Sequence, residues 1–148
     1  MKVGGAVIVT SSNLTIIKSS FEGNSAGVGG AIYAEHSSDI MIANCTFALN
    51  TMTCIAEGAS CFGGGVLYSI ESAMTVCCSI FRNNSVRGNG GVFAFQESTA
   101  NIYQSIFMNN RAEGRGGVIS ANSANITIST SEFRSNSADE GGVVHAFI

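Results

Sequence analysis

The chain has 148 residues, of which 45% are hydrophobic and 11% charged, with 18 glycines, no proline and a net charge of −3. That apolar content excludes a disordered polar tract, and the few scattered basic residues argue against a nucleic acid partner. No uninterrupted apolar run approaches the roughly 20 residues of a membrane helix, so we expect no membrane span in this segment.

The start of the chain leads straight into repeat material. Met1, Lys2 and Val3 precede the first repeat motif, and no apolar signal segment stands before them. The length suits one domain. We therefore expect residues 1–148 to form a single repeat domain that is an excerpt of a longer chain.

Glycine pairs followed by two apolar residues recur along the chain at nearly regular intervals. Their first glycines are Gly4, Gly29, Gly64, Gly90, Gly116 and Gly141, at spacings of 25, 35, 26, 26 and 25 residues. Glycine permits positive φ angles and close approach between backbones, so each pair predicts a tight turn into a strand. Two glycines per repeat and β-branched runs such as residues 6–10 disfavour helices.

A second short strand is predicted further along each repeat. Apolar residues alternate there with other side chains, at Leu14/Ile16, Ile40/Ile42, Met74/Val76, Ala100/Ile102 and Ile126/Ile128. Apolar side chains two residues apart lie on the same face of a strand, so each of these strands has one buried side.

A Phe-x-x-Asn motif closes each repeat. Its members are Phe21/Asn24, Phe47/Asn50, Phe81/Asn84, Phe107/Asn110 and Phe133/Asn136. In stacked coils like positions lie about 4.8 Å apart. We therefore expect the phenylalanines to stack inward as a ladder. We expect the asparagines to occupy the next turn, where Asn tolerates left-handed backbone angles, and to hydrogen-bond from coil to coil.

Taken together, the motifs predict an all-β fold. It is a right-handed, single-stranded parallel β-helix (a β-solenoid of pectin-lyase-like type) with about 26 residues per coil and five to six coils. Both motif series lengthen at the same place, which predicts one loop insertion at about residues 51–62. Such a loop on a rigid scaffold is a candidate for recognition.

The cysteines leave two questions open. A disulfide between Cys54 and Cys61 would close the inserted loop and stabilise it by about 2 kcal/mol. Cys45 and the Cys77–Cys78 pair lie on adjacent coils. They would form either a bridge between coils or free thiols, with Cys45 occupying the place that Ser has in other repeats.

Four sequons begin at Asn13, Asn44, Asn83 and Asn125. They would accept N-glycans in a eukaryotic secretory route. The alternative is chance occurrence in a chain that is rich in Asn, Ser and Thr.

A search for chemistry finds no catalytic constellation. Among the acidic residues Glu71 and Glu97 share a repeat position and would lie side by side on neighbouring coils. His36 and His145 do not share a position with each other and have no evident nucleophile partner. We expect solvated surface at all four residues, and no metal or cofactor.

The motifs resemble one family. Gly4–Val7 and Gly29–Ile32 read Gly-Gly-Ala-apolar, and with Phe-x-x-Asn they are similar to the chlamydial-type polymorphic outer membrane protein repeat, although later copies carry Val in place of Ala. The resemblance covers residues 4–144. It implies a right-handed β-helix in a surface-exposed or secreted adhesin.

We therefore expect a non-enzymatic extracellular or cell-surface module for adhesion or structural spacing. Its partners would be a protein or glycan on a cell surface, or neighbouring copies stacked end to end. One alternative is a glycan-binding or polysaccharide-active β-helix enzyme that uses Glu71 and Glu97. Another is a filament-forming element whose exposed terminal coils associate.

Overall fold

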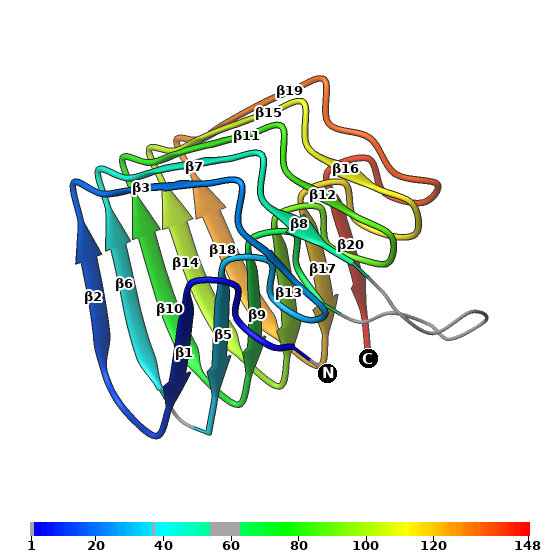
Figure 1. The fold of residues 1–148 in the computed structure, drawn as a ribbon. Coiled ribbons are helices and arrows are strands. Elements are labelled where there is room, and N and C mark those ends of the chain that lie inside the picture. The colour runs from blue at the N-terminus through cyan, green and yellow to red at the C-terminus, as the bar shows by residue number, and fades with distance from the viewer. Residues whose placement is uncertain (1, 37, 54–62) are drawn as a thin grey trace.

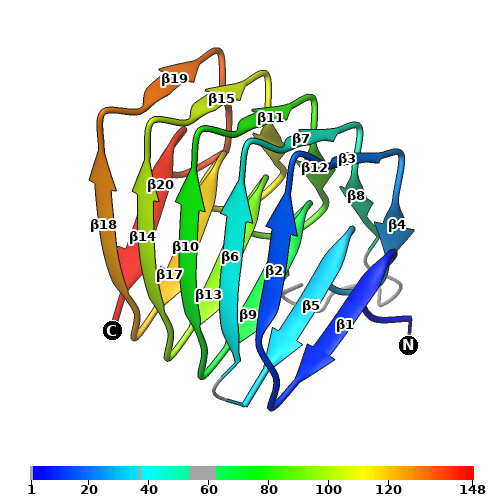
Figure 2. The same cartoon turned by 90° about the vertical axis from the view of Figure 1, so that its left-hand side faces the viewer.

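The structure is a computed structural model that describes residues 2–36, 38–53 and 63–148. The regular elements in these residues are strands, and they form four parallel sheets (Figure 1). The strands stack as a solenoid with the two termini at opposite ends of the stack (Figure 2). The predicted all-β parallel solenoid is confirmed.

Each coil visits the four sheets in order, and we number the sheets I to IV accordingly. Sheet I consists of β1 (Val7–Thr10), β5 (Ile32–Glu35), β9 (Leu67–Ile70), β13 (Phe93–Gln96), β17 (Ile119–Asn122) and β20 (Val144–Phe147). Sheet II consists of β2 (Leu14–Ile17), β6 (Asp39–Ala43), β10 (Ala73–Cys77), β14 (Thr99–Tyr103) and β18 (Asn125–Ser129). Sheet III consists of β3 (Ser20–Glu22), β7 (Thr46–Ala48), β11 (Ile80–Arg82), β15 (Ile106–Met108) and β19 (Glu132–Arg134). Sheet IV consists of β4 (Ser25–Ala26), β8 (Thr51–Met52), β12 (Ser85–Val86) and β16 (Arg111–Ala112).

The register between coils follows the glycine spacing. In sheet I, Val7 pairs with Ile32, and the chain of partners continues through Leu67, Phe93, Ile119 and Val144. These steps are 25, 35, 26, 26 and 25 residues, the same as the steps between glycine pairs. A coil is therefore one repeat.

The insertion begins later than predicted. Thr51 and Met52 are strand β8, which pairs with β4 and with β12, and the Thr53 amide still donates to the Ala26 carbonyl at 2.8 Å. A strand of two residues has no alternation to reveal it, so the sequence assigned these residues to the loop. Cys54 and Cys61 lie outside the described residues.

The five phenylalanines of sheet III form an inward column. Successive ring centroids from Phe21 to Phe133 lie 4.8, 5.1, 4.9 and 5.0 Å apart, and the rings are within 7° of parallel. Phe47, Phe81 and Phe107 are completely buried. Phe93 of sheet I meets the column edge-on at 4.9 Å from Phe81. Aromatic burial of this size dominates the energetics of the core.

The asparagines form a hydrogen-bonded column beside it. The side-chain oxygen of Asn84 accepts from both the backbone amide and the side-chain amide of Asn50, each at 3.0 Å. The Asn84 side-chain amide donates to the Asn110 side-chain oxygen at 3.0 Å and to the Phe47 carbonyl at 3.1 Å. The same pattern repeats in neighbouring coils, so amides that are buried at this corner are satisfied.

The left-handed residue of this corner is the one before the asparagine. Gly23, Leu49, Asn83, Asn109 and Ser135 have φ between 50° and 67°, and the ladder asparagines are not among the residues with positive φ. The expectation that Asn itself takes the left-handed angle is therefore wrong. The preceding residue turns the chain, and this frees the Asn amide to bond along the stack.

Two serine columns turn the other corners. Ser79, Ser105 and Ser131 each accept the backbone amide of the preceding coil at 3.1 to 3.3 Å, with Cys45 in the same column. Ser38, Ser72 and Ser98 do the same between sheets I and II, at 3.2 to 3.4 Å. The second column was missed, although Ser12, whose amide donates to Ser38, and the three members of the column repeat at the same steps of 26, 34 and 26 residues as Phe21 to Phe107.

Except in the last pair, the second glycine of each pair stands where no side chain fits. A Cβ at Gly91 would lie 2.1 Å from the Gly117 carbonyl oxygen of the next coil, whereas at Gly142 the nearest such atom, the Asn136 carbonyl oxygen, is 3.5 Å away. The pair therefore lets the coils approach each other closely.

We predict that Asn84→Ala lowers the free energy of unfolding by about 2–4 kcal/mol, because it leaves buried amides and a carbonyl without partners. The measurement is the midpoint of urea unfolding. Asn24→Ala, in the first and more open coil, should cost less than half as much. Equal losses at the two positions would contradict the ladder.

Gly91→Ala should abolish folding or shift the unfolding midpoint severely, because the added methyl overlaps the backbone of the next coil. The matched variant Gly142→Ala should be neutral or stabilising by up to about 0.5 kcal/mol, through a less flexible unfolded chain. A well-folded Gly91→Ala protein, judged by circular dichroism and thermal melting, would refute the close approach.

Candidate functional site

The corner between sheets I and II holds both carboxylates that were considered for chemistry, Glu71 and Glu97. His36, Glu71 and Glu97 occupy the same place in three successive coils, each with φ between 47° and 58°. The backbone hydrogen bonds show this, because the backbone amide of His36 donates to the Ile70 carbonyl and the backbone amide of Glu71 donates to the Gln96 carbonyl. We call Glu35, His36, Glu71 and Glu97 the acidic corner.

Glu35 is the most constrained member of the acidic corner. Its carboxylate accepts from the Tyr33 hydroxyl at 2.8 Å and from the Thr10 hydroxyl at 3.1 Å. His36 bridges the carboxylates, with its ring nitrogens 3.8 Å from Glu35 and 3.6 Å from Glu71. Burial, reinforced by the hydrogen bond to Glu35, raises the pKa of Tyr33 to about 12, so the phenol remains a neutral donor.

The acidic corner stands open to water. The side chains of His36 and Glu71 are 59% and 53% exposed, and Glu97 is exposed too. Two carboxylates one coil apart have a spacing near the roughly 5 Å of retaining glycosidases. Acid–base chemistry, however, gains most where walls exclude water and fixed dipoles surround the reacting bond.

Sequence analysis paired Glu71 with Glu97 and expected His36 on the solvated surface, but it did not place His36 in the same column. All three lie six residues after the second glycine of their repeat, so that offset was the available signal. His145 lies elsewhere, at the end of sheet I, where its ring is 3.5 Å from the Glu140 carboxylate. The Glu140 carboxylate also forms an ion pair with Arg115, whose Nε lies 2.9 Å from it.

The described cysteines are free thiols. Cys45 is buried at 2% exposure with its sulfur 3.2 Å from the Ala43 carbonyl oxygen. Cys77 is buried and Cys78 exposed. The alternative of free thiols, with Cys45 in a serine column, therefore describes these residues, and no bridge joins them to each other.

All four sequon asparagines are exposed. Asn44 and Asn83 have φ of 54° and 55° at corners of the coil. Asn125 points outward from β18, and Asn13 directly precedes β2. Glycan attachment at each remains a prediction.

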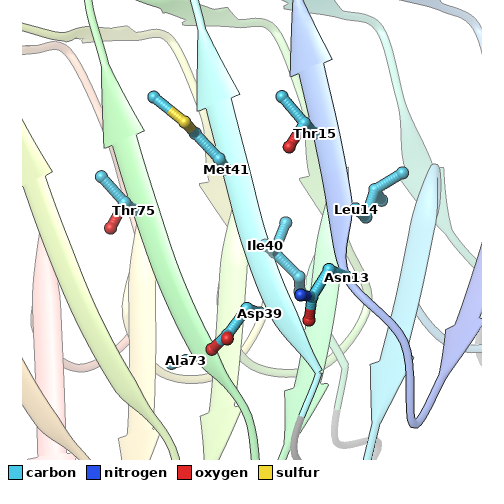
Figure 3. A pocket seen from close by; sticks show the side chains of 8 residues that line it. All are labelled: Asn13, Leu14, Thr15, Asp39, Ile40, Met41, Ala73 and Thr75. Atoms are coloured by element: carbon cyan, nitrogen blue, oxygen red, sulfur yellow. The ribbon is translucent and has the colours of Figure 1, made fainter.

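The outward side of sheet II is a flat face, which we call the sheet II face. Its residues alternate with the buried pairs of each strand: Thr15, Ile17, Asp39, Met41, Ala43, Ala73, Thr75, Cys77, Thr99, Asn101, Tyr103, Asn125, Thr127 and Ser129. A shallow hollow of about 430 Å³ lies on it, lined by Asn13, Leu14, Thr15, Asp39, Ile40, Met41, Ala73 and Thr75 (Figure 3). Sequence analysis did not single out this face because its residues do not repeat.

Residues 2–36, 38–53 and 63–148 contain no group of three or more His, Cys, Asp or Glu side chains arranged to hold a metal ion. In the same part of the chain no helix is long and apolar enough to cross a membrane.

Comparison with known proteins gives a family and a distant relative. The family model for the right-handed beta helix region matches residues 4–146. Metabotropic glutamate receptor-like protein R of Dictyostelium discoideum is 36% identical over 86 residues, which are 58% of this chain and 5% of that protein. The chain thus spans about a twentieth of that relative's length.

No solved structure matches the chain significantly. The family model covers all but the ends of the chain, and the stacked parallel sheets have the architecture that it describes. The chain belongs to the right-handed β-helix family.

Proposed function

We propose that the chain is a non-enzymatic extracellular or cell-surface β-helix module that supports adhesion or acts as a rigid spacer. One observation carries the proposal: the residues that recur in every coil lie in the internal ladders, or in the glycine pairs against which coils pack. Outward positions differ from coil to coil. A rigid stack with varied faces is what repeat proteins use as an extended binding surface.

Three further observations support a surface role. The motifs resemble the polymorphic outer membrane protein repeat of chlamydial type, which implies an adhesin. The matched relative is named as a receptor-like protein. The four sequon asparagines are exposed, as acceptance of N-glycans in a secretory route requires. The partner on this proposal is a protein or glycan of a cell surface.

A second candidate function is cleavage of a polysaccharide. It is favoured by the placement of Glu71 and Glu97 on neighbouring coils. We rank it second because both carboxylates stand in water at a corner, and because Glu35 is occupied by the Tyr33 and Thr10 hydroxyls.

Beads coated with the chain should attach to cultured cells more than uncoated beads do, with attachment measured under flow. The Gly142→Ala variant should retain attachment. The Gly91→Ala variant, which we expect to misfold, should lose it. Attachment no greater than that of uncoated beads on every cell type tested would count against adhesion.

Incubation with pectic and other uronic polymers should release no new reducing ends or unsaturated products, and Glu71→Gln and Glu97→Gln should behave like the parent chain. Turnover that disappears in either variant would overturn the non-enzymatic proposal and favour the second candidate.

A further inference from the structure

The sheet II face is almost free of charge. Among its described residues Asp39 alone carries a formal charge, with Lys18 at the margin beyond β2. The other outward charges of the described sheets lie on different faces: Glu22, Arg82, Glu132 and Arg134 on sheet III, Glu35 on sheet I, and Arg111 on sheet IV. Contact with the Cys77 thiol raises the pKa of Tyr103, which keeps this phenol neutral as well.

The polar groups of the sheet II face are hydroxyls and amides in columns. The partners Thr15, Met41, Thr75, Asn101 and Thr127 follow one another along the stack. Asp39, Ala73, Thr99 and Asn125 form the next column. Each column is interrupted once, by Met41 and by Ala73 respectively, and between its other neighbouring members donors and acceptors recur at about 4.8 Å along the solenoid axis. A polyhydroxyl ligand can exchange hydrogen bonds with them.

Apolar groups stand within and beside these columns. Met41 and Ile17 are 41% and 50% exposed, and Tyr103 is partly exposed. A sugar ring presents C–H faces as well as hydroxyls, so it matches a surface that mixes both kinds of group. Sites for small ligands commonly combine apolar surface with a few placed polar groups.

The hollow gives the face a seat for one part of a ligand. The hollow lies over β2, β6 and β10, with Ala73 on its β10 side, and Figure 3 shows the side chains of Asp39, Met41 and Thr75 that line it. The five strands are hydrogen-bonded to one another, so this seat is rigid before any ligand binds. Pre-organisation lowers the entropy cost of binding.

The dimensions of the face favour a thread-like occupant over a protein. Five strands at about 4.8 Å and five residues at about 3.3 Å cover roughly 20 Å by 16 Å. That is roughly 300–400 Å², against about 800 Å² per partner in a standard protein interface. Adding a peptide strand requires a free sheet edge, and the edges of this sheet are β2 and β18 at the ends of the stack, not on the face.

We propose that the sheet II face binds an uncharged polysaccharide that lies along its columns of hydroxyl and amide groups, with the hollow over β2, β6 and β10 holding one part of it. This inference rests on the proposed surface-adhesion function, for which it names a ligand class and a face. Acidic polymers are disfavoured because Asp39 would repel them and no cation lies among the columns.

The test is affinity electrophoresis of the chain, made in a host without N-glycosylation so that Asn13 and Asn125 are bare. Native gels contain mannan, galactomannan or a soluble β-glucan, with polygalacturonate and heparin as acidic polymers. Retardation is measured against gels without polymer. We expect retardation by at least one neutral polymer and by neither acidic one.

Thr75→Arg and Asn101→Arg should each weaken that binding at least ten-fold, because a long charged side chain then stands in the central column. Thr46→Arg, the same change on the outward side of sheet III, should leave it unchanged. Circular dichroism and urea unfolding establish that each variant is folded. Two variants in the same column are used because one of them alone could lose binding through misfolding.

Three outcomes would overturn the inference. These are retardation by acidic polymers alone, retardation that Thr46→Arg weakens as much as Thr75→Arg does, and absence of retardation by every neutral polymer. If coated beads still attach to cells in the last case, the ligand assignment fails while the adhesion proposal stands. If neither retardation by a neutral polymer nor attachment of coated beads is observed, both the ligand assignment and the adhesion proposal fail.

Discussion

Backbone hydrogen bonding between coils is the constraint on which the structure depends. Each coil lies in parallel register on the next, so a side chain has the equivalent side chain of the neighbouring coils above and below it. Residue types that interact well with the same type in the next coil are therefore favoured. Phe stacks on Phe, Asn hydrogen-bonds to Asn, and paired glycines let the backbones of two coils approach closely. Like charges in a column repel, which accounts for a charged fraction of only 11%. Where Glu71 and Glu97 do share a column, they stand at an open corner with His36 beside them.

Because of this constraint, the residues of a coil that stabilise the fold are different from those that are free to bind a ligand. Inward positions and corners are committed to ladders, whose loss affects folding rather than binding. Outward positions are free of that commitment, and each sheet has acquired its own character. Sheet III presents charged side chains, among them the ion pair of Glu132 with Arg134, whereas sheet II presents hydroxyls and amides. A ligand would therefore distinguish the faces of one rigid body by charge.

The ladders could be predicted from the sequence because they repeat, and the outer faces could not because they vary. Phe81 and Asn84 recur in every coil, so their partners follow from the spacing. The left-handed angle at Leu49 could not be foreseen, because leucine rarely adopts it and the register of the stack, in which the Leu49 amide donates to the Arg82 carbonyl, sets it. Strand β8 escaped notice because two residues show no alternation. His36 was not placed in the column of Glu71 and Glu97 because its column mates are carboxylates rather than histidines.

The asparagine column also has a direction. Each side-chain oxygen from Asn50 through to Asn136 accepts from the asparagine of the coil before it. A coil placed ahead of Asn24 would have to donate to it, and one placed beyond Asn136 would have to accept. The two ends of the stack are chemically complementary to each other and not to themselves. Lengthening this solenoid, by gene duplication or by association of copies, is therefore possible head to tail, whereas a symmetric pairing of like ends would leave donors facing donors.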